Sequence, residues 1–274
     1  MSDETSAGPL GTTILFDVSD AGVATITLNR PDAANAVLPE QRDLIIELMR
    51  RCDNDRAVRV VALRSNGKQF CSGADVGTLK AAQAATPGVG DGMRKIMQGA
   101  QALVASMLDC SKPVVAVVQG PAAGLGAHLA YACDFVVAAE TAFFLEPFLQ
   151  RGIIVDAGGT YLLPRLVGMQ RAKELCFLAE RLPAAEAKAM GLVNRVAPAD
   201  QLDAVADELI ARLATSPTSA LSMTKKLLNA SFDTDRASLF LIEGMGQEMQ
   251  GHSADPKEGV MAFIERRPSN FQGY

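Results

Sequence analysis

Apolar residues recur along the chain with two spacings, which separate predicted strands from predicted helices. Residues 14 to 31 hold two β-rich runs around an Asp-Ala-Gly turn, which predicts a hairpin. From residue 39 to 52 the apolar positions fall at i, i+3, i+4 and i+7, which is typical of an amphipathic helix. Residues 58 to 65 are β-rich again. Because strand alternates with helix, we predict an α/β core.

The alternation continues through the middle of the chain and then stops. After residue 165 no strand pattern is visible, and helical spacing continues to about residue 267. We therefore predict an α/β body in residues 1–198 and an all-helical region in residues 199–274. The middle elements are expected as a helix at 92–109, a strand at 112–120, a short helix at 124–132 and a strand at 134–140.

Composition narrows the class of protein. The 274 residues are 49% hydrophobic and carry a net charge of -5, so the chain can bury a large core but offers no basic surface for nucleic acid. No apolar run approaches the roughly 20 residues that span a bilayer, and the first dozen residues do not resemble an export signal. The five cysteines are widely spaced and only two histidines occur. We expect a cytoplasmic protein with reduced thiols, no metal site and no membrane partner.

Two glycine-rich turns are the first candidates for chemistry. Residues 70–75 and 120–126 each follow a predicted buried strand. Glycine lets a backbone approach a ligand closely, and N–H groups that point outward can stabilise a developing oxyanion. The alternative is that both turns are ordinary connections between a strand and a helix. Neither turn matches a dinucleotide or P-loop fingerprint.

Five motifs in order resemble the enoyl-CoA hydratase/isomerase (crotonase) family, and the resemblance covers residues 13 to about 271. It implies a spiral core of ββα units, a C-terminal helical region used for trimerisation, and an acyl-coenzyme A thioester as the substrate. It also implies a homotrimer or homohexamer and no cofactor, because coenzyme A is part of the substrate. The motifs are ITLNRPDAANAV, FCSGADV, SKPVVAVVQGPAAGLGAHLAYACDFVVAAETAFF, GIIVDAGGTYLLPRLVG and KEGVMAFIERRPSNF.

The resemblance assigns roles to single positions. Members of the family stabilise a thioester enolate with two backbone N–H groups, which here correspond to Ala74 and Leu125. Two more positions, Phe263 and Arg266, match residues that enclose the coenzyme, often across a subunit boundary. A charged residue such as Arg266 is otherwise most often a solvated surface residue, and the same holds for Lys68. The residues expected to line the coenzyme A path are Ala34, Ala36, Lys68, Ser72, Asp75 and Val76.

The sequence departs from the family pattern at the positions of the catalytic acid and base. Hydratases of the family hold water between two glutamates, and the matching positions here are His128 and Phe148. Glu146 lies two residues before Phe148, but Pro147 intervenes and leaves its direction open. His128 is either a second proton carrier or a packed histidine beside Tyr131. Phe148 is expected to line the substrate pocket.

Asp156 is the remaining acid, and it matches an aspartate that faces the acyl chain in several branches of the family, which include isomerases and a dehalogenase. Three apolar residues precede it and a Gly-Gly pair follows within the segment GIIVDAGGT. In one interpretation it is a desolvated base that moves a proton. In the other it is a helix N-cap that accepts the N–H of Gly158 or Gly159.

A single carboxylate can remove a proton at one carbon and return it at another, whereas water addition benefits from two. We therefore favour double-bond isomerisation of an enoyl-CoA, with Asp156 as the acid/base. The alternatives are a hydratase with a non-standard acid/base set, an acyl-CoA hydrolase in which Asp156 activates water or forms an acyl adduct, and an acyl-CoA-binding protein that has lost catalysis.

Overall fold

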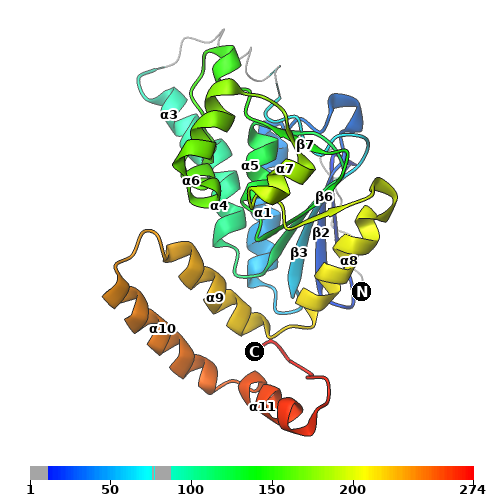
Figure 1. Ribbon diagram of the computed structural model, residues 1–274, viewed down its shortest axis with the longest axis vertical. Helices are drawn as coiled ribbons and strands as arrows, with labels where there is room; N and C mark the ends of the chain where they lie inside the picture. The colour runs from blue at the N-terminus through cyan, green and yellow to red at the C-terminus, as the bar shows by residue number, and fades with distance from the viewer. Residues whose placement is uncertain (1–11, 76, 78–87) are drawn as a thin grey trace.

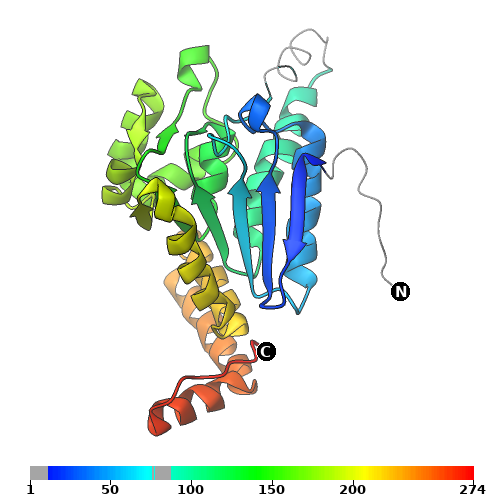
Figure 2. The ribbon, with the colours of Figure 1, turned by 90° about the vertical axis from the view of Figure 1, so that its right-hand side faces the viewer.

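A six-stranded sheet forms the centre of the chain in the computed structural model, which describes residues 12–75, 77 and 88–274. The strand order is β1-β2-β3-β4-β6-β9, with β1 and β2 antiparallel and all other neighbours parallel. Figure 2 shows the hairpin strands at one edge of this sheet. The predicted hairpin is therefore confirmed. The strands are β1 (Ile14–Val18), β2 (Val23–Leu28), β3 (Val60–Ser65), β4 (Val114–Val118), β6 (Phe135–Ala139) and β9 (Arg195–Ala197).

Both faces of the central parallel strands β3, β4 and β6 are mostly buried, which explains their nearly continuous apolar sequences. Along β3, Val61 and Leu63 face one apolar core, which also holds the buried side chains of α1 (Pro39–Asn54) and α4 (Ala102–Asp109). Val60 and Ala62 face a second core against α8 (Leu202–Ala214). Successive residues of a strand point to opposite faces, so one strand contributes to both cores.

A second, smaller sheet lies beside the main one and holds the segment that follows β4. It has the strand order β5-β7-β8, with β5 parallel to β7 and β7 antiparallel to β8. The helix α5 (Leu125–Tyr131) begins directly after β5 and is entirely buried. The strands are β5 (Ala122–Ala123), β7 (Phe143–Leu145) and β8 (Leu182–Pro183).

The expectation of no strand after residue 165 is wrong. Strand β8 completes the small sheet, and β9 pairs with β6 at the edge of the main sheet. These strands have two and three residues. A strand that short shows no alternation, and only its partner in the fold defines it.

The helices α9 (Thr218–Ala230), α10 (Arg236–Gly251) and α11 (Asp255–Glu265) extend away from the sheets (Figure 1). The helix α8, in contrast, packs on the main sheet. The division at residue 198/199 stays a prediction. None of the helices in the described residues is long and apolar enough to span a membrane.

The remaining helices surround the small sheet and the first core. The α3 and α4 helices are joined by a π-helical turn at Met97–Gln101, so the predicted helix at 92–109 is one almost continuous segment. The long helix α6 is kinked at Gly168, where φ is 77°. The helices are α3 (Asp91–Ile96), α6 (Gly159–Leu178) and α7 (Ala184–Ala189), and short 3-10 turns lie at Pro31–Ala33, Leu149–Arg151 and Ala199–Gln201.

Candidate active site

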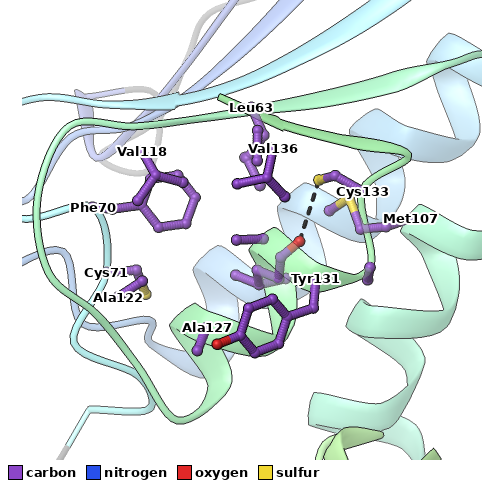
Figure 3. Packing of buried hydrophobic residues seen from close by; sticks show 14 of the residues in the cluster. Leu63, Phe70, Cys71, Met107, Val118, Ala122, Ala127, Tyr131, Cys133 and Val136 are labelled. Carbon is purple, nitrogen blue, oxygen red and sulfur yellow. Dashed lines mark hydrogen bonds between the residues drawn. The ribbon is translucent and has the colours of Figure 1, made fainter. Parts of the chain in front are cut away.

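The two glycine-rich turns lie against each other. The N–H groups of Phe70 and Cys71 donate to the carbonyl of Pro121 at 3.1 and 3.2 Å, and Ala123 N–H donates to the carbonyl of Cys71 at 2.9 Å. Cys71 and Ala122 form an isolated parallel bridge, and their side chains lie together in the core (Figure 3). Backbone bonds thus fix the distance between the turns.

Glycine is required at two points of this contact. Gly73 has φ of +103°, and a Cβ there would lie 2.9 Å from the carbonyl oxygen of Ala123. A Cβ on Gly126 would lie 2.2 Å from the carbonyl oxygen of Cys71. Any side chain at either position would push the turns apart.

The contact brings the two predicted oxyanion donors near each other. The amide nitrogen of Leu125 lies 3.7 Å from the position that a Cβ of Gly73 would occupy, and Ala74 is the next residue. Within the described ranges no acceptor is recorded for the N–H of Ala74 or of Leu125. The role of these two amides as donors to a substrate carbonyl stays a prediction.

The segment that carries Ala34 and Ala36 runs beside the first turn. Ser72 N–H donates to the carbonyl of Ala34 at 3.0 Å, and Val37 pairs with Ala74 in a parallel bridge. Four of the residues predicted to bind coenzyme A are therefore neighbours of the Ala74 amide. The set is Ala34, Ala36, Ser72 and Asp75, of which Ser72 is exposed.

The other predicted coenzyme contacts are less closely grouped. Lys68 is exposed, two residues before the first turn. Val76 lies outside the described residues. Phe263 and Arg266 are exposed on α11 and at its end, far from α5 within the chain (Figure 1). A role for these two in the site stays a prediction that needs a second subunit.

Two polar residues that the sequence did not single out hold this segment in place. Asn35 is buried with φ of 53°, and its side-chain amide donates to the carbonyls of Asn66 and Gln69, at 2.8 Å in each case. Arg30 pairs with Asp75 at 3.3 Å and donates to the carbonyl of Ala36 at 2.7 Å. The Asp75 carboxylate is thus occupied in orienting the loop.

Asp156 lies in the turn before α6. It is half-buried, and the turn continues through Ala157 and Gly158, where φ is 46° and 79°. The N-cap residue of α6 is Gly158 and the helix has no side-chain cap bond, so the N-cap interpretation of Asp156 is wrong. The bond to the helix start comes from the backbone: Gly159 N–H donates to the Asp156 carbonyl at 2.9 Å. The side chain remains free for chemistry.

The environment changes the acidity of Asp156. Burial raises the pKa of its carboxyl above the ordinary value, and a charged His128 opposes this effect by lowering the pKa. Desolvation penalises a carboxylate, while a nearby cation stabilises it. A raised pKa suits a carboxyl group that takes and returns a proton near neutral pH.

His128 is completely buried and lies on α5, three residues after Leu125. Its Nε2 lies 2.8 Å from Oε2 of Glu146, which is 2% exposed. The ring of Phe148 stacks on the imidazole with a centroid distance of 5.4 Å and an interplanar angle of 9°. Phe148 also lies against Gly124, 3.5 Å from the position of a Cβ there. The structure thus brings His128 and Phe148 together with the second turn.

The sequence left the direction of Glu146 open and indicated Gly159 only as a possible partner of an Asp156 cap. A Cβ on Gly159 would lie 2.4 Å from Cε1 and from Nε2 of His128. In the sequence, Glu146 is a carboxylate two positions before Phe148, and Gly159 is the second glycine of a pair. Neither pattern indicates a contact with His128. No local pattern reveals a contact between residues 18 positions apart.

No group of three or more histidine, cysteine, aspartate or glutamate side chains in the described part of the chain could hold a metal ion. The polar groups of the site are instead two free amides, one half-buried carboxyl and one buried imidazole–carboxylate pair. Preorganised N–H donors beside a carboxyl group are the polar groups that enolate chemistry requires. The fold and the site together are those of an α/β protein with a candidate site for such chemistry.

Comparison with known proteins identifies the family. Residues 19–274 match the sequence model of the enoyl-CoA hydratase/isomerase family, and the chain belongs to this family. A crystal structure of a putative enoyl-CoA hydratase from Streptomyces coelicolor superimposes with a TM-score of 0.91 at 34% identity, over 100% of both chains. The predicted crotonase fold is confirmed, and the chain is an acyl-CoA enzyme of this family.

The names of the relatives refer to more than one reaction. A probable enoyl-CoA hydratase from Rhodobacter capsulatus is 36% identical over 95% of this chain and 98% of the relative. The 1,2-epoxyphenylacetyl-CoA isomerase of Escherichia coli is 34% identical over 93% of this chain and 96% of the relative. A trans-2-decenoyl-[acyl-carrier-protein] isomerase from Streptococcus mutans is 31% identical over 95% of this chain and 98% of the relative.

Proposed function

We propose that this protein moves a double bond along an enoyl-CoA thioester. The N–H groups of Ala74 and Leu125 stabilise the enolate oxygen, and Asp156 carries the proton. The carboxylate removes a proton from C2 of a 3-enoyl thioester, and the electron pair delocalises onto the thioester oxygen. The same carboxyl group returns the proton at C4, which leaves the double bond between C2 and C3. No water is consumed and no redox change occurs.

The observation that carries this proposal is the enclosure of His128 and Glu146. The two side chains bond to each other at 2.8 Å and are 0% and 2% exposed, and the ring of Phe148 stacks on the imidazole. They are therefore unable to hold a water molecule between them in an open site. Asp156 is the half-buried acid that remains beside α5. One accessible carboxyl group suits a proton shuttle better than water addition.

Hydration is the second candidate, because relatives named as probable enoyl-CoA hydratases are as similar as the named isomerases. A hydratase would need Glu146 or His128 to reach a water molecule next to Asp156. The two reactions give different products from the same thioesters: isomerisation interconverts 3-enoyl and 2-enoyl forms, and hydration yields a 3-hydroxyacyl form. Incubation with both enoyl-CoA isomers, followed by product analysis, separates them.

The decisive variant is Asp156→Asn, which keeps the shape of the side chain and removes the base. We expect kcat for double-bond migration to fall on the order of 10²-fold or more, with KM for the thioester nearly unchanged. The matched control is Asp200→Asn, at an exposed aspartate, which should leave both constants as in the wild type. Equal turnover of the Asp156 variant and the wild type would refute the proposal.

The assembly and the location of the enzyme stay predictions. We expect a homotrimer or homohexamer in the cytoplasm, in which Phe263 and Arg266 of one subunit help to enclose the coenzyme A of another. Measurement of the solution mass tests the oligomeric state.

A further inference from the structure

The first turns of α6 are tied to the C-terminal helices through one aspartate. Asp233 lies in the turn between α9 and α10. The hydroxyl of Tyr161 donates to its Oδ2 at 2.7 Å, and Nη2 of Arg165 donates to its Oδ1 at 2.6 Å. Tyr161 and Arg165 are four residues apart on α6, so they lie on the same face of the helix. These three residues together are called the Asp233 clasp below.

The clasp is a network and not an isolated ion pair. The guanidinium carbon of Arg165 lies 3.6 Å from the centre of the Tyr161 ring, and Nη1 of Arg165 donates to the Tyr161 carbonyl at 3.2 Å. An isolated exposed ion pair contributes little, whereas charge-assisted bonds within a network favour one geometry. The hydrogen bonds from Tyr161 and Arg165 lower the pKa of Asp233, so its carboxyl group is ionised at neutral pH.

A cleft of about 850 Å³ lies between α6 and α9 on the side of the clasp. Leu162 and Leu166 line the cleft from α6, and Leu221 and Leu228 line it from α9. Packing against neighbours normally fixes the position of a helix, and a helix that borders open space lacks those contacts on that side. The polar contacts of the clasp therefore hold α6 against the C-terminal helices where apolar packing is missing.

The same part of α6 is bonded to the turn that carries Asp156. The N–H of Tyr161 donates to the carbonyl of Gly158 at 3.0 Å, and the N–H of Gly159 donates to the carbonyl of Asp156 at 2.9 Å. On the other side, a Cβ on Gly159 would lie 2.4 Å from the ring of His128. The start of α6 is thus held between α5 and the clasp, and a displacement of this helical turn would move Asp156 with it.

We propose that Asp233 is a positioning residue, which fixes the start of α6 so that the Asp156 carboxyl group stays in line with the Ala74 and Leu125 amides. This inference rests on the proposed role of Asp156. Asp233 acts through Tyr161 and does not touch the substrate. The C-terminal helices thereby take part in placing the proton carrier.

The clasp can be observed without turnover, because the chain has only three tyrosines. The hydrogen bond to Asp233 raises the pKa of the Tyr161 hydroxyl, and it also sets the chemical shift of the ring carbon that bears this hydroxyl. With ¹³C-labelled tyrosine at neutral pH, we expect this signal to shift in Asp233→Asn, while the signals of Tyr131 and Tyr274 stay in place. Tyr161→Phe assigns the signal. An unchanged Tyr161 signal in Asp233→Asn would overturn the inference.

The effect on catalysis is read from kcat and KM separately. In Asp233→Asn we expect kcat for double-bond migration to fall roughly tenfold with KM within about twofold of the wild type, because a small misplacement of the base affects the proton transfer and not the binding of the thioester. Tyr161→Phe keeps the bond from Arg165, so we expect a smaller loss of about threefold. The double variant should lose no more than Asp233→Asn, since both changes remove the same bond. The control Glu243→Gln changes an exposed glutamate of α10 and should leave both constants unchanged.

A purely structural role gives a different result. If Asp233→Asn melts at a lower temperature but keeps the wild-type kcat per folded molecule well below its melting temperature, the inference is overturned. If Asp233→Asn does not fold, kcat and KM of Tyr161→Phe decide. A wild type without double-bond migration overturns the proposed function together with this inference. Migration that is lost in Asp156→Asn but intact in Asp233→Asn overturns only the role of Asp233, so the two failures are distinguishable.

Discussion

Two pairs of largely buried ionisable side chains in the described part of the chain have the same length but different surroundings. Lys225 of α9 lies 2.8 Å from Asp134, and His128 of α5 lies 2.8 Å from Glu146. Lys225 also donates to the carbonyls of Met107 and Lys112 at 3.1 and 3.2 Å. The Lys225 ammonium thus has three recorded acceptors, whereas His128 and Glu146 each have one unpartnered polar atom in the described part of the chain.

We expect the difference to separate a structural pair from a functional one. A buried charge is tolerated when it is paired and hydrogen-bonded, as Lys225 is where it attaches α9 to the residue before β6. An unsatisfied buried polar atom costs about 1–3 kcal/mol, so it persists where another requirement maintains it. For the pair of His128 and Glu146, we expect this requirement to be the adjacent candidate site.

The largest effect on stability is expected from the structural pair. Lys225→Ala leaves the Asp134 carboxylate buried without its cation, and burial already raises the pKa of Asp134. We expect a loss of about 3–5 kcal/mol in the free energy of unfolding, measured by urea denaturation. Lys226→Ala, at the exposed neighbouring lysine, is the control and should change stability by less than about 0.5 kcal/mol. Similar losses of unfolding free energy in the two variants would show that the ion pair between Lys225 and Asp134 does not cause the stabilisation.

A smaller effect is expected at the contact between Gly159 and His128. Gly159→Ala places a methyl group 2.4 Å from the imidazole, so the ring or the start of α6 must shift. We expect a destabilisation of about 1–3 kcal/mol together with a drop in kcat.

The control for this variant is Gly244→Ala in α10, where a Cβ meets nothing within 4 Å. Alanine is the better helix former by about 1 kcal/mol, so this change should be neutral or stabilising. If Gly159→Ala behaved like Gly244→Ala in stability and turnover, the ring would not be held as the structure indicates.

The smallest effect concerns the stability of Asp156→Asn as pH changes. Burial raises the pKa of Asp156 in the folded chain above its unfolded value. The folded chain therefore binds this proton more tightly, and the cost of the ionised group appears as pH rises through the folded value. We expect the variant to melt about 1–3 °C above the wild type at pH 8.

The cost of the ionised Asp156 is absent below the ordinary pKa of an aspartate. The gain in melting temperature of Asp156→Asn should therefore disappear near pH 4, as measured by thermal scans across pH. A gain that is the same at every pH would mean that packing, and not the charge, causes it.

Local sequence was sufficient for most of the fold and for locating the two turns of the candidate site. Periodicity located the hairpin and the helices α1 and α8, and the glycines marked both turns that carry the Ala74 and Leu125 amides. The strands β8 and β9 were missed because two or three residues form no pattern without a partner. The direction of Glu146 stayed open for a similar reason, since it depends on how the segment after β7 leaves the small sheet.

The sequence by itself determined the family, the α/β core and the acid that differs from the hydratase pattern, because these follow from residue order and from spacing within single elements. Only the tertiary structure decided that Asp156 caps no helix and that His128 is paired with Glu146. It also showed that Gly159 must lack a side chain. Each of these facts depends on atoms from segments far apart in the chain that packing brings within a few ångströms, where desolvation and close contact set the charge and position of a side chain.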